Sequence, residues 1–168
     1  MDVIEVIKTR RSIRAYKDKP IPKDILQNLV DAARFAPTAR GIQPWEFVVV
    51  TEPTTLKKIG EIADTGRFIW GAGACIAVFC QDTKYYLEDG CAAVENILIA
   101  ATALGVGSCW VAGDKKPYCS EISSLLNAPG TFKLVGLIAL GYPRSENDFR
   151  IAAKRSLQEV IHWEKFNS

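Results

Sequence analysis

The sequence lacks the residue patterns of several common catalytic and metal sites. It contains one histidine, and none of its five cysteines has Cys-x-x-Cys spacing, so a zinc site has little support and we expect no metal. No Ser, His and Asp residues are arranged as in a known triad, and no pair of carboxylates is marked out as acid and base. A GxGxxG fingerprint and a P-loop are also absent. If the protein is an enzyme, these absences place its chemistry in a cofactor.

Long apolar runs and a strong net charge are missing too. The longest apolar stretch, from Ile97 to Val106, is interrupted by a threonine and a glycine and is too short to span a bilayer. Asp2 and Glu5 near the N-terminus argue against a secretory signal. A formal net charge of +2 is too small to attract nucleic acid or membranes in bulk. We therefore expect a cytoplasmic protein without nucleic-acid or membrane partners.

The cysteines lie mostly among Ala, Val, Ile and Phe, where a free cysteine packs as a small hydrophobic residue. We expect them to be reduced core residues, in keeping with a cytoplasmic location. They are Cys75, Cys80, Cys91, Cys109 and Cys119.

The composition is that of one soluble globular domain, residues 1–168. Hydrophobic residues make up 48% and charged residues 24%, and no repeat, low-complexity tract or Gly/Ser linker divides the chain. Periodicity, prolines and capping-box pairs (Asp2 with Glu5, Ser156 with Glu159) predict helices at 2–9, 22–36, 53–62, 88–104, 117–126 and from 156 onward. Apolar and β-branched runs predict strands at 47–51, 74–80, 106–112 and 134–140. The chain opens on two helices and shows no βαβ rhythm, so we expect an α+β fold with helices packed on a sheet.

The expected helix at 88–104 is apolar on nearly every side. A helix of this kind must be buried all round. Packing between two copies of the chain meets this requirement, because an obligate interface resembles a core cut in half. The alternative is a helix enclosed by the sheet and the other helices of one subunit. We favour the dimer.

A cluster of basic residues follows the first expected helix. Arg10, Arg11 and Arg14, with Ser12 between them, could hold a phosphate bidentately, and the third arginine could reach a carbonyl or ring nitrogen of the same ligand. The alternative is a solvated basic turn at a helix C-terminus. Lys154-Arg155 is a second basic pair, and its simplest reading alone is surface charge. Binding of nucleic acid by the stretch from Arg10 to Lys19 is a weaker hypothesis, because aromatic residues are not interleaved with the basic ones.

Two further segments have the character of a ligand site. The loop from Ala36 to Trp45 contains two prolines and a glycine and could hold polar groups against a planar ligand. The alternative is an ordinary connection from helix to strand, with Trp45 as a core anchor. Glycines at 105, 107 and 113 bracket the segment 108–112 and could let its backbone approach a ligand closely.

Taken together and in order, these segments resemble the nitroreductase family. The resemblance rests on Arg-Arg-Ser-x-Arg at 10–14, on Ala-Pro-Thr and Gln-Pro-Trp in the loop 36–45, on the helix from Asp89 that runs into the segment 103–110, and on Lys154-Arg155 with Leu157 and Glu159. It covers roughly residues 2 to 160. It implies an α+β fold with a central, mostly antiparallel sheet flanked by helices, and a homodimer with FMN at the subunit interface.

The resemblance also implies residue roles. Arg10, Arg11 and Ser12 would hold the FMN phosphate and ribityl chain, Lys154 and Arg155 would complete the phosphate site, and Arg14 would reach the pyrimidine edge. The loop residues Pro37, Thr38, Ala39, Gly41 and Gln43 would come from the partner subunit and pack beside the isoalloxazine ring. Trp110 and Val111 would line the flavin, with the backbone amides of Ala112 and Gly113 near its N5 atom.

The implied function is that of an FMN-dependent oxidoreductase. NADH or NADPH would pass a hydride through flavin N5 to an organic acceptor, a nitroaromatic or quinone in vitro, by a ping-pong mechanism. Other FMN chemistry, such as enone reduction or reductive dehalogenation, and a flavin-binding module without turnover are the alternatives. The chain departs from the family at Gly41, where relatives usually carry Asn, and it is short, which favours a compact and open site.

Overall fold

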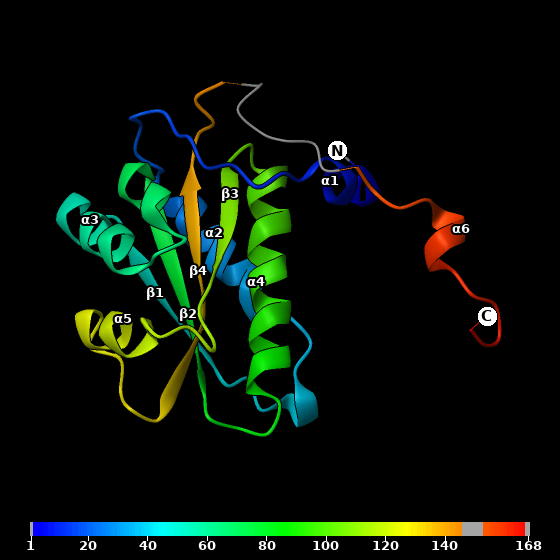
Figure 1. The fold of residues 1–168 in the computed structure, drawn as a ribbon. Coiled ribbons are helices and arrows are strands. Elements are labelled where there is room, and N and C mark those ends of the chain that lie inside the picture. The colour runs from blue at the N-terminus through cyan, green and yellow to red at the C-terminus, as the bar shows by residue number, and fades with distance from the viewer. Residues whose placement is uncertain (1, 146–152, 167–168) are drawn as a thin grey trace.

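The computed structural model describes residues 2–145 and 153–166. The first of these ranges contains one sheet with helices on both faces (Figure 1). Within this part of the chain the sheet has four strands in the order β1-β2-β4-β3, and every neighbouring pair is antiparallel. The strands are β1 (Trp45–Val50), β2 (Ala74–Gln81), β3 (Gly107–Ala112) and β4 (Phe132–Gly141). The expected α+β fold with a mostly antiparallel sheet is confirmed.

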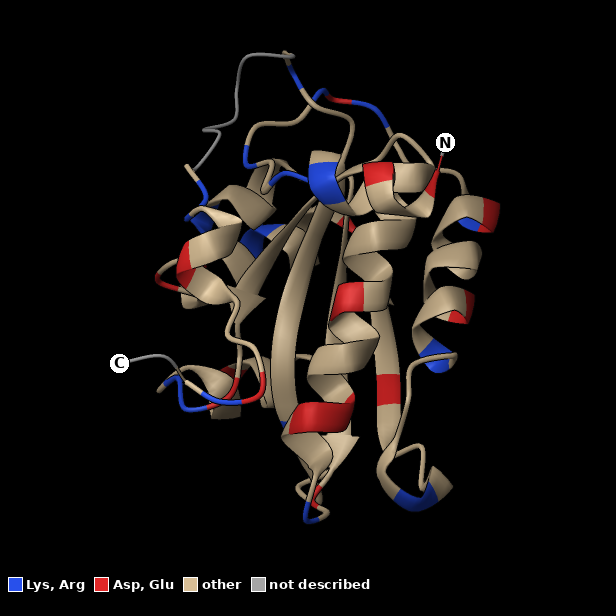
Figure 2. Ribbon diagram, turned by 90° about the vertical axis from the view of Figure 1, so that its right-hand side faces the viewer, with Lys and Arg blue, Asp and Glu red and all other residues tan. Residues whose placement is uncertain are grey.

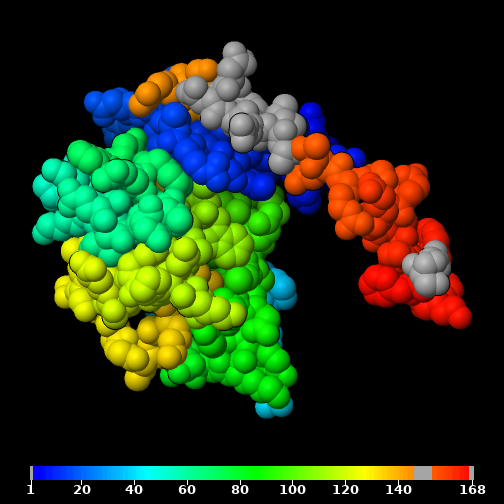
Figure 3. Space-filling model, viewed as in Figure 1, coloured from blue at the N-terminus to red at the C-terminus, as the bar shows by residue number. Residues whose placement is uncertain are grey.

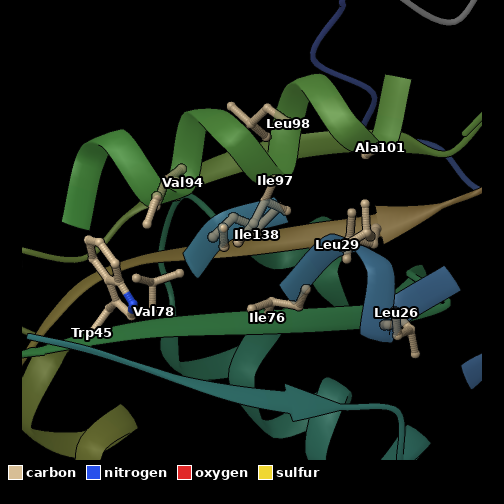
Figure 4. Close-up of a cluster of buried hydrophobic side chains, with 14 of the residues drawn as sticks. Leu26, Leu29, Trp45, Ile76, Val78, Val94, Ile97, Leu98, Ala101 and Ile138 are labelled. Carbon is tan, nitrogen blue, oxygen red and sulfur yellow. The ribbon is translucent and has the colours of Figure 1, made fainter. Parts of the chain in front are cut away.

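The two central strands, β2 and β4, are buried on both faces, which explains their continuous apolar sequence. On one face α2 (Lys23–Arg34) and α4 (Tyr86–Ala103) cover the sheet (Figure 4). Their leucine, valine and isoleucine side chains pack over those of the strands: Leu26, Leu29, Val94 and Ile97 over Ile76, Val78 and Ile138. On the other face lie α3 (Pro53–Ile62), α5 (Cys119–Leu125) and the 3-10 helix η2 (Arg67–Gly71), with Ile59, Ile69, Ile122 and Leu137 at the centre of a second core.

The first helix, α1 (Val3–Thr9), begins after Asp2 as expected, but Asp2 makes no side-chain capping hydrogen bond there. The capping box expected from Asp2 and Glu5 is therefore wrong. The box at the start of α6 (Leu157–Val160) is confirmed, because the backbone N–H of Ser156 donates to Glu159 Oε2 over 2.7 Å. The two pairs have the same spacing, but only the second forms a capping box. A box requires both side chains to turn back to the first turn of the helix and hydrogen-bond its backbone.

Helix α4 is not enclosed by its own subunit. Its inner side, with Ala93, Val94 and Ile97, is fully buried against the sheet, whereas Cys91 and Ile99 are only half-buried. The alternative in which one subunit encloses the helix is thus wrong for this protomer. An apolar strip of α4 is therefore partly open to solvent in the protomer.

The two ends of the chain also expose apolar side chains. In α1, Val3 and Ile4 are exposed, and the segment 153–166 stands away from the rest of the molecule (Figure 3). This C-terminal arm exposes 72% of Trp163 and 87% of Phe166, fractions that a folded protein rarely leaves in water. In the described ranges no helix is long and apolar enough to cross a membrane.

Candidate functional site

The basic turn after α1 lies along the outer edge of β3. The backbone N–H of Ile13 donates to the carbonyl of Ser108 over 2.9 Å, and Ser12 pairs with Ser108 in a parallel bridge. β3 joins β4 on its other side, and no other described strand pairs with it. The segment 10–14 therefore runs beside a strand edge whose later residues, from Trp110 on, stay open.

The three arginines have different surroundings. Arg11 donates through Nη1 to the carbonyls of Lys8 (2.7 Å) and Arg10 (2.8 Å), which are free acceptors at the end of α1. For this residue the helix-terminus alternative holds in part. Arg14 places its guanidinium 5.8 Å from the ring centre of Phe68, and the side chain of Arg10 has no hydrogen bond or ion pair with any described residue.

Two buried polar atoms beside this turn lack a partner among the described residues: Arg11 Nε and Ser108 Oγ. Ser108 is only 1% exposed. A buried donor without an acceptor costs about 1–3 kcal/mol, so such atoms mark places where a ligand or water completes the bonding. The sequence analysis did not single out Ser108. Its position between two glycines in a predicted strand was the available signal.

Further along β3 the side chains divide between the two faces of the sheet. Trp110 and Ala112 are exposed, but Val111 points into the core, so only its backbone can face a ligand. The Ala112 carbonyl accepts a hydrogen bond from the Tyr118 hydroxyl, which fixes the end of the strand.

The glycines around β3 are needed by the fold itself. A Cβ on Gly113 would stand 2.7 Å from the backbone nitrogen of Gly136, and one on Gly107 would stand 3.0 Å from the carbonyl oxygen of Gly141, both on β4. Gly105 has φ +72°, a left-handed conformation that ends α4. The neighbouring strand and a tight turn therefore account for these glycines, and close approach of the backbone of this segment to a ligand stays a prediction.

The loop 37–43 is attached to the start of α4 by a buried carboxylate. Thr38 Oγ1 donates to Asp89 Oδ2 (2.8 Å), the N–H of Ala39 donates to Asp89 Oδ1 (3.0 Å), and the N–H of Gln43 donates to Thr38 Oγ1 (3.0 Å). Asp89 is 5% exposed. The sequence analysis used it only as part of a helix pattern and missed this role. An acidic residue in an otherwise apolar helix was the available signal.

The unusual Gly41 fits its backbone conformation. Gly41 has φ +67°, and a Cβ there would meet no atom within 4 Å. Asn and Gly are the residues that most readily adopt this left-handed region, so the exchange of one for the other keeps the loop. The loop contains the short 3-10 helix η1 (Ala39–Gly41), and Trp45 after it is 7% exposed, as expected of a core anchor.

The loop and the basic turn lie at opposite ends of α4 in one protomer. Thr38 is bound at Asp89 in the first turns, whereas Ser12 pairs with Ser108 beyond the C-terminus of the helix (Figure 1). At 1.5 Å per residue, the helix from Asp89 to Ala103 is about 20 Å long. One chain therefore does not bring its expected flavin-binding segments together.

The second basic pair lies on the C-terminal arm. Lys154 and Arg155 are exposed, and Arg155 Nη2 donates to the carbonyl of Glu159 over 2.6 Å. Within the described ranges no hydrogen bond joins either residue to the segment 10–14. Their role at a phosphate site stays a prediction.

The cysteines are all free, and Cys75, Cys80 and Cys109 are buried. Burial raises the pKa of Cys75 and of Cys80 to about 12. Burial also raises the pKa of Cys109, although the nearby charge of Arg14 opposes the shift. These thiols stay protonated at neutral pH and serve packing.

Comparison with known proteins agrees with this architecture. The Nitroreductase family model matches residues 7–66 and 65–142. A protein of Archaeoglobus fulgidus, provisionally named NADH dehydrogenase/NAD(P)H nitroreductase, is 36% identical over 98% of this chain and 99% of its own. A structure from Parabacteroides distasonis with the same provisional name superposes with a TM-score of 0.90 at 29% identity, covering 98% of both chains. A nitroreductase with bound FMN from Bacteroides fragilis gives a TM-score of 0.81 at 27% identity over 98% of this chain and 100% of that one.

The fold, in which helices cover both faces of an antiparallel sheet, is that of the matched nitroreductase structures. This chain belongs to the nitroreductase family.

Proposed function

We propose that the protein is an FMN-dependent oxidoreductase that takes electrons from NADH or NADPH and reduces a small organic acceptor. The observation that carries this proposal is a pair of buried donors without a partner among the described residues, Arg11 Nε and Ser108 Oγ. They lie beside the guanidinium of Arg10, which none of the described residues binds. Such a cluster suits the phosphate and ribityl hydroxyls of FMN, because charged donors hold phosphate oxygens strongly. The FMN bound by a family member of similar length supports the assignment.

The residues have separable tasks under this proposal. Arg10, Arg11, Ser12 and Ser108 hold the phosphate end and the ribityl chain, and Lys154 and Arg155 approach the phosphate from the arm. Arg14, held against Phe68, presents its positive charge to the pyrimidine edge, where negative charge develops on reduction. The open edge of β3 from Trp110 to Gly113 offers backbone groups to the ring system.

Bound FMN supplies the redox chemistry, accepting a hydride from NAD(P)H and passing electrons on to the acceptor. The chain itself needs no acid or base for this, which agrees with the sequence. Donor and acceptor occupy the same pocket in turn, giving ping-pong kinetics, and nitroaromatics and quinones serve as acceptors in vitro.

The functional unit we propose is a homodimer with a flavin at each of two shared sites. The half-covered strip on α4, the exposed Val3 and Ile4, and the apolar C-terminal arm supply surface for a partner. The separation of about 20 Å between the loop and the basic turn supports sites completed by the partner's loop.

An absorbance spectrum of the purified protein tests the proposal. We expect flavin bands that bleach when NADPH is added anaerobically, steady oxidation of NADPH with menadione, and a dimer by sedimentation. A yellow protein that NADH and NADPH both leave unbleached would indicate a binding module without turnover. A colourless monomer that does not bind FMN when the flavin is added in excess would overturn the proposal altogether.

A further inference from the structure

A hollow of about 700 Å³ adjoins the basic turn and has no part in the flavin site described above. Its wall comes from the segment after Arg14, from the start of α3, from the end of η2 and from the end of β4. The residues that matter for its chemistry are Lys17, Asp18, Lys19, Trp70 and Arg144. Figure 2 shows Lys and Arg gathered on the loops at this upper end of the molecule.

The hollow carries an excess of positive charge. Lys17, Lys19 and Arg144 are exposed and form no ion pair with any residue in the described ranges, and Asp18 is the single acidic residue in the described lining. Lys19 Nζ lies 4.4 Å from the ring centre of Tyr142, which fixes one of the cations at the rim. Free cations of this kind are donors for phosphate oxygens.

An aromatic surface stands beside these cations. Trp70 is 53% exposed on η2, a segment held in place by the fully buried Ile69 next to it. Lys57 Nζ lies 5.0 Å from the indole ring centre, although it also reaches Glu61 at 3.9 Å. A rigid, exposed indole face next to phosphate-binding cations suits a purine base that carries phosphate.

The hollow lies directly beside the proposed position of the flavin. Tyr16 forms part of its wall, and the N–H of Arg144 donates to the carbonyl of Ala15 over 3.1 Å. η2 carries both Trp70, in the hollow, and Phe68, which packs by Arg14. Arg14 and Lys17 are three residue steps apart, which spans at most about 10 Å. A dinucleotide, with a pyrophosphate and two riboses between its rings, is long enough to reach from one place to the other.

We propose that this hollow binds the adenosine phosphate end of the electron donor, and that its cations favour the extra 2′-phosphate of NADPH over NADH. The inference rests on the proposed function, since it assigns the far end of the donor whose nicotinamide is oxidised at the flavin site. Trp70 stacks on the adenine, and Lys17, Lys19 and Arg144 hold the phosphates.

The kinetic test compares two donors in the FMN-loaded enzyme. NADPH carries the adenosine phosphate, whereas 1-benzyl-1,4-dihydronicotinamide lacks it. In the double variant Lys17→Gln/Lys19→Gln and in Trp70→Ala, we expect the KM for NADPH to rise at least fivefold, with kcat and the KM for the benzyl donor unchanged. Lys133→Gln is the control, because this lysine pairs with Asp82 at 3.3 Å far from the hollow. Equal changes with both donors, or no change with either, would overturn the proposal.

A binding measurement that needs no turnover decides the same question. Calorimetric titration of the oxidised holoprotein with 2′,5′-ADP should give a submillimolar Kd, with 5′-ADP weaker by at least fivefold, and the double lysine variant should lose both. Absence of binding by the wild-type protein overturns the inference. If the wild-type enzyme oxidises neither donor, the proposed function fails, and the titration still judges the hollow.

Discussion

Thr38 donates a 2.8 Å hydrogen bond to the buried carboxylate of Asp89, which lies 51 residues further along the chain. The same carboxylate accepts from the backbone of Ala39, so one side chain of α4 holds a loop in which Arg40, Gly41 and Gln43 all have positive φ angles. A loop of this conformation is not stable by itself. Non-glycine residues with positive φ are strained, and contacts with the surrounding structure must offset that strain.

Replacing Asp89 should therefore loosen the loop. Asp89→Ala leaves the N–H of Ala39 and the hydroxyl of Thr38 without acceptors, and we expect the free energy of unfolding to fall by about 1–3 kcal/mol. Urea denaturation at one fixed protein concentration measures it. Glu95→Ala, an exposed acidic residue on the same helix, is the control and should change stability by less than about 0.5 kcal/mol. Similar losses in both variants would show that the hydrogen bonds that the loop donates to Asp89, which we call the Thr38–Asp89 clamp, have no stabilising role.

Arg10→Ala should separate cofactor binding from folding. The side chain of Arg10 has no described protein partner, so its loss removes a ligand contact and little else. A charged hydrogen bond contributes about 1.5–3 kcal/mol, so the Kd for FMN should rise on the order of tenfold to a hundredfold. Fluorescence titration of the apoprotein with FMN measures this. Arg34→Ala, which removes an exposed arginine paired with Asp31, should leave the Kd unchanged. An unaltered flavin affinity in Arg10→Ala would remove the phosphate role.

Ser108→Ala should have opposite effects on the apoprotein and on flavin binding. The hydroxyl is buried and unpartnered within the described part of the chain, so its removal should leave the apoprotein as stable as before or slightly more stable. Flavin affinity should fall, because the variant lacks the hydroxyl that we propose donates a hydrogen bond to FMN. Thermal unfolding without FMN and titration with FMN give the two values, and Ser120→Ala on the surface of α5 is the control. A large loss of apoprotein stability would mean that the hydroxyl has a protein partner instead.

Gly113→Ala should damage the sheet rather than the flavin contact. The new methyl group would press on the backbone of Gly136 and Val135 at 2.7 Å, and overpacking of this kind costs about 1–3 kcal/mol. Gly130→Ala, where a Cβ meets nothing within 4 Å, should be neutral or slightly stabilising. Chemical denaturation of the two apoproteins compares them. If both alanines are tolerated equally, β3 and β4 are free to separate at this point.

Local sequence patterns were enough to predict most of the fold. β2 and β4 are continuous apolar runs, and α2 and α4 have apolar residues at helical spacing. Because such patterns already indicate a buried strand or helix, each element could be predicted without knowledge of what packs against it. The basic turn suggested a ligand site only in combination with the later segments, since three arginines within five residues are on their own also typical of a solvated turn at a helix end.

The rest of the site depends on contacts between distant segments. Ser108 matters because Ser12 pairs beside it, and Asp89 matters because Thr38 folds back onto α4. Each segment marks its own residue as unusual, but neither segment alone shows which residue it will contact. The packing role of the glycines around β3 was missed for this reason too, because the atoms that exclude a side chain there belong to β4.

The long spacer that α4 puts between the Thr38 loop and the Arg10 turn has a genetic consequence in the proposed dimer. Two inactive alleles, one without Arg10 and one without the Thr38–Asp89 clamp, fall in different halves of each shared site. When both are coexpressed, every mixed pair carries one site with both lesions and one site with neither. Coexpression of the two alleles should therefore restore activity, even though the protein encoded by each allele alone is inactive.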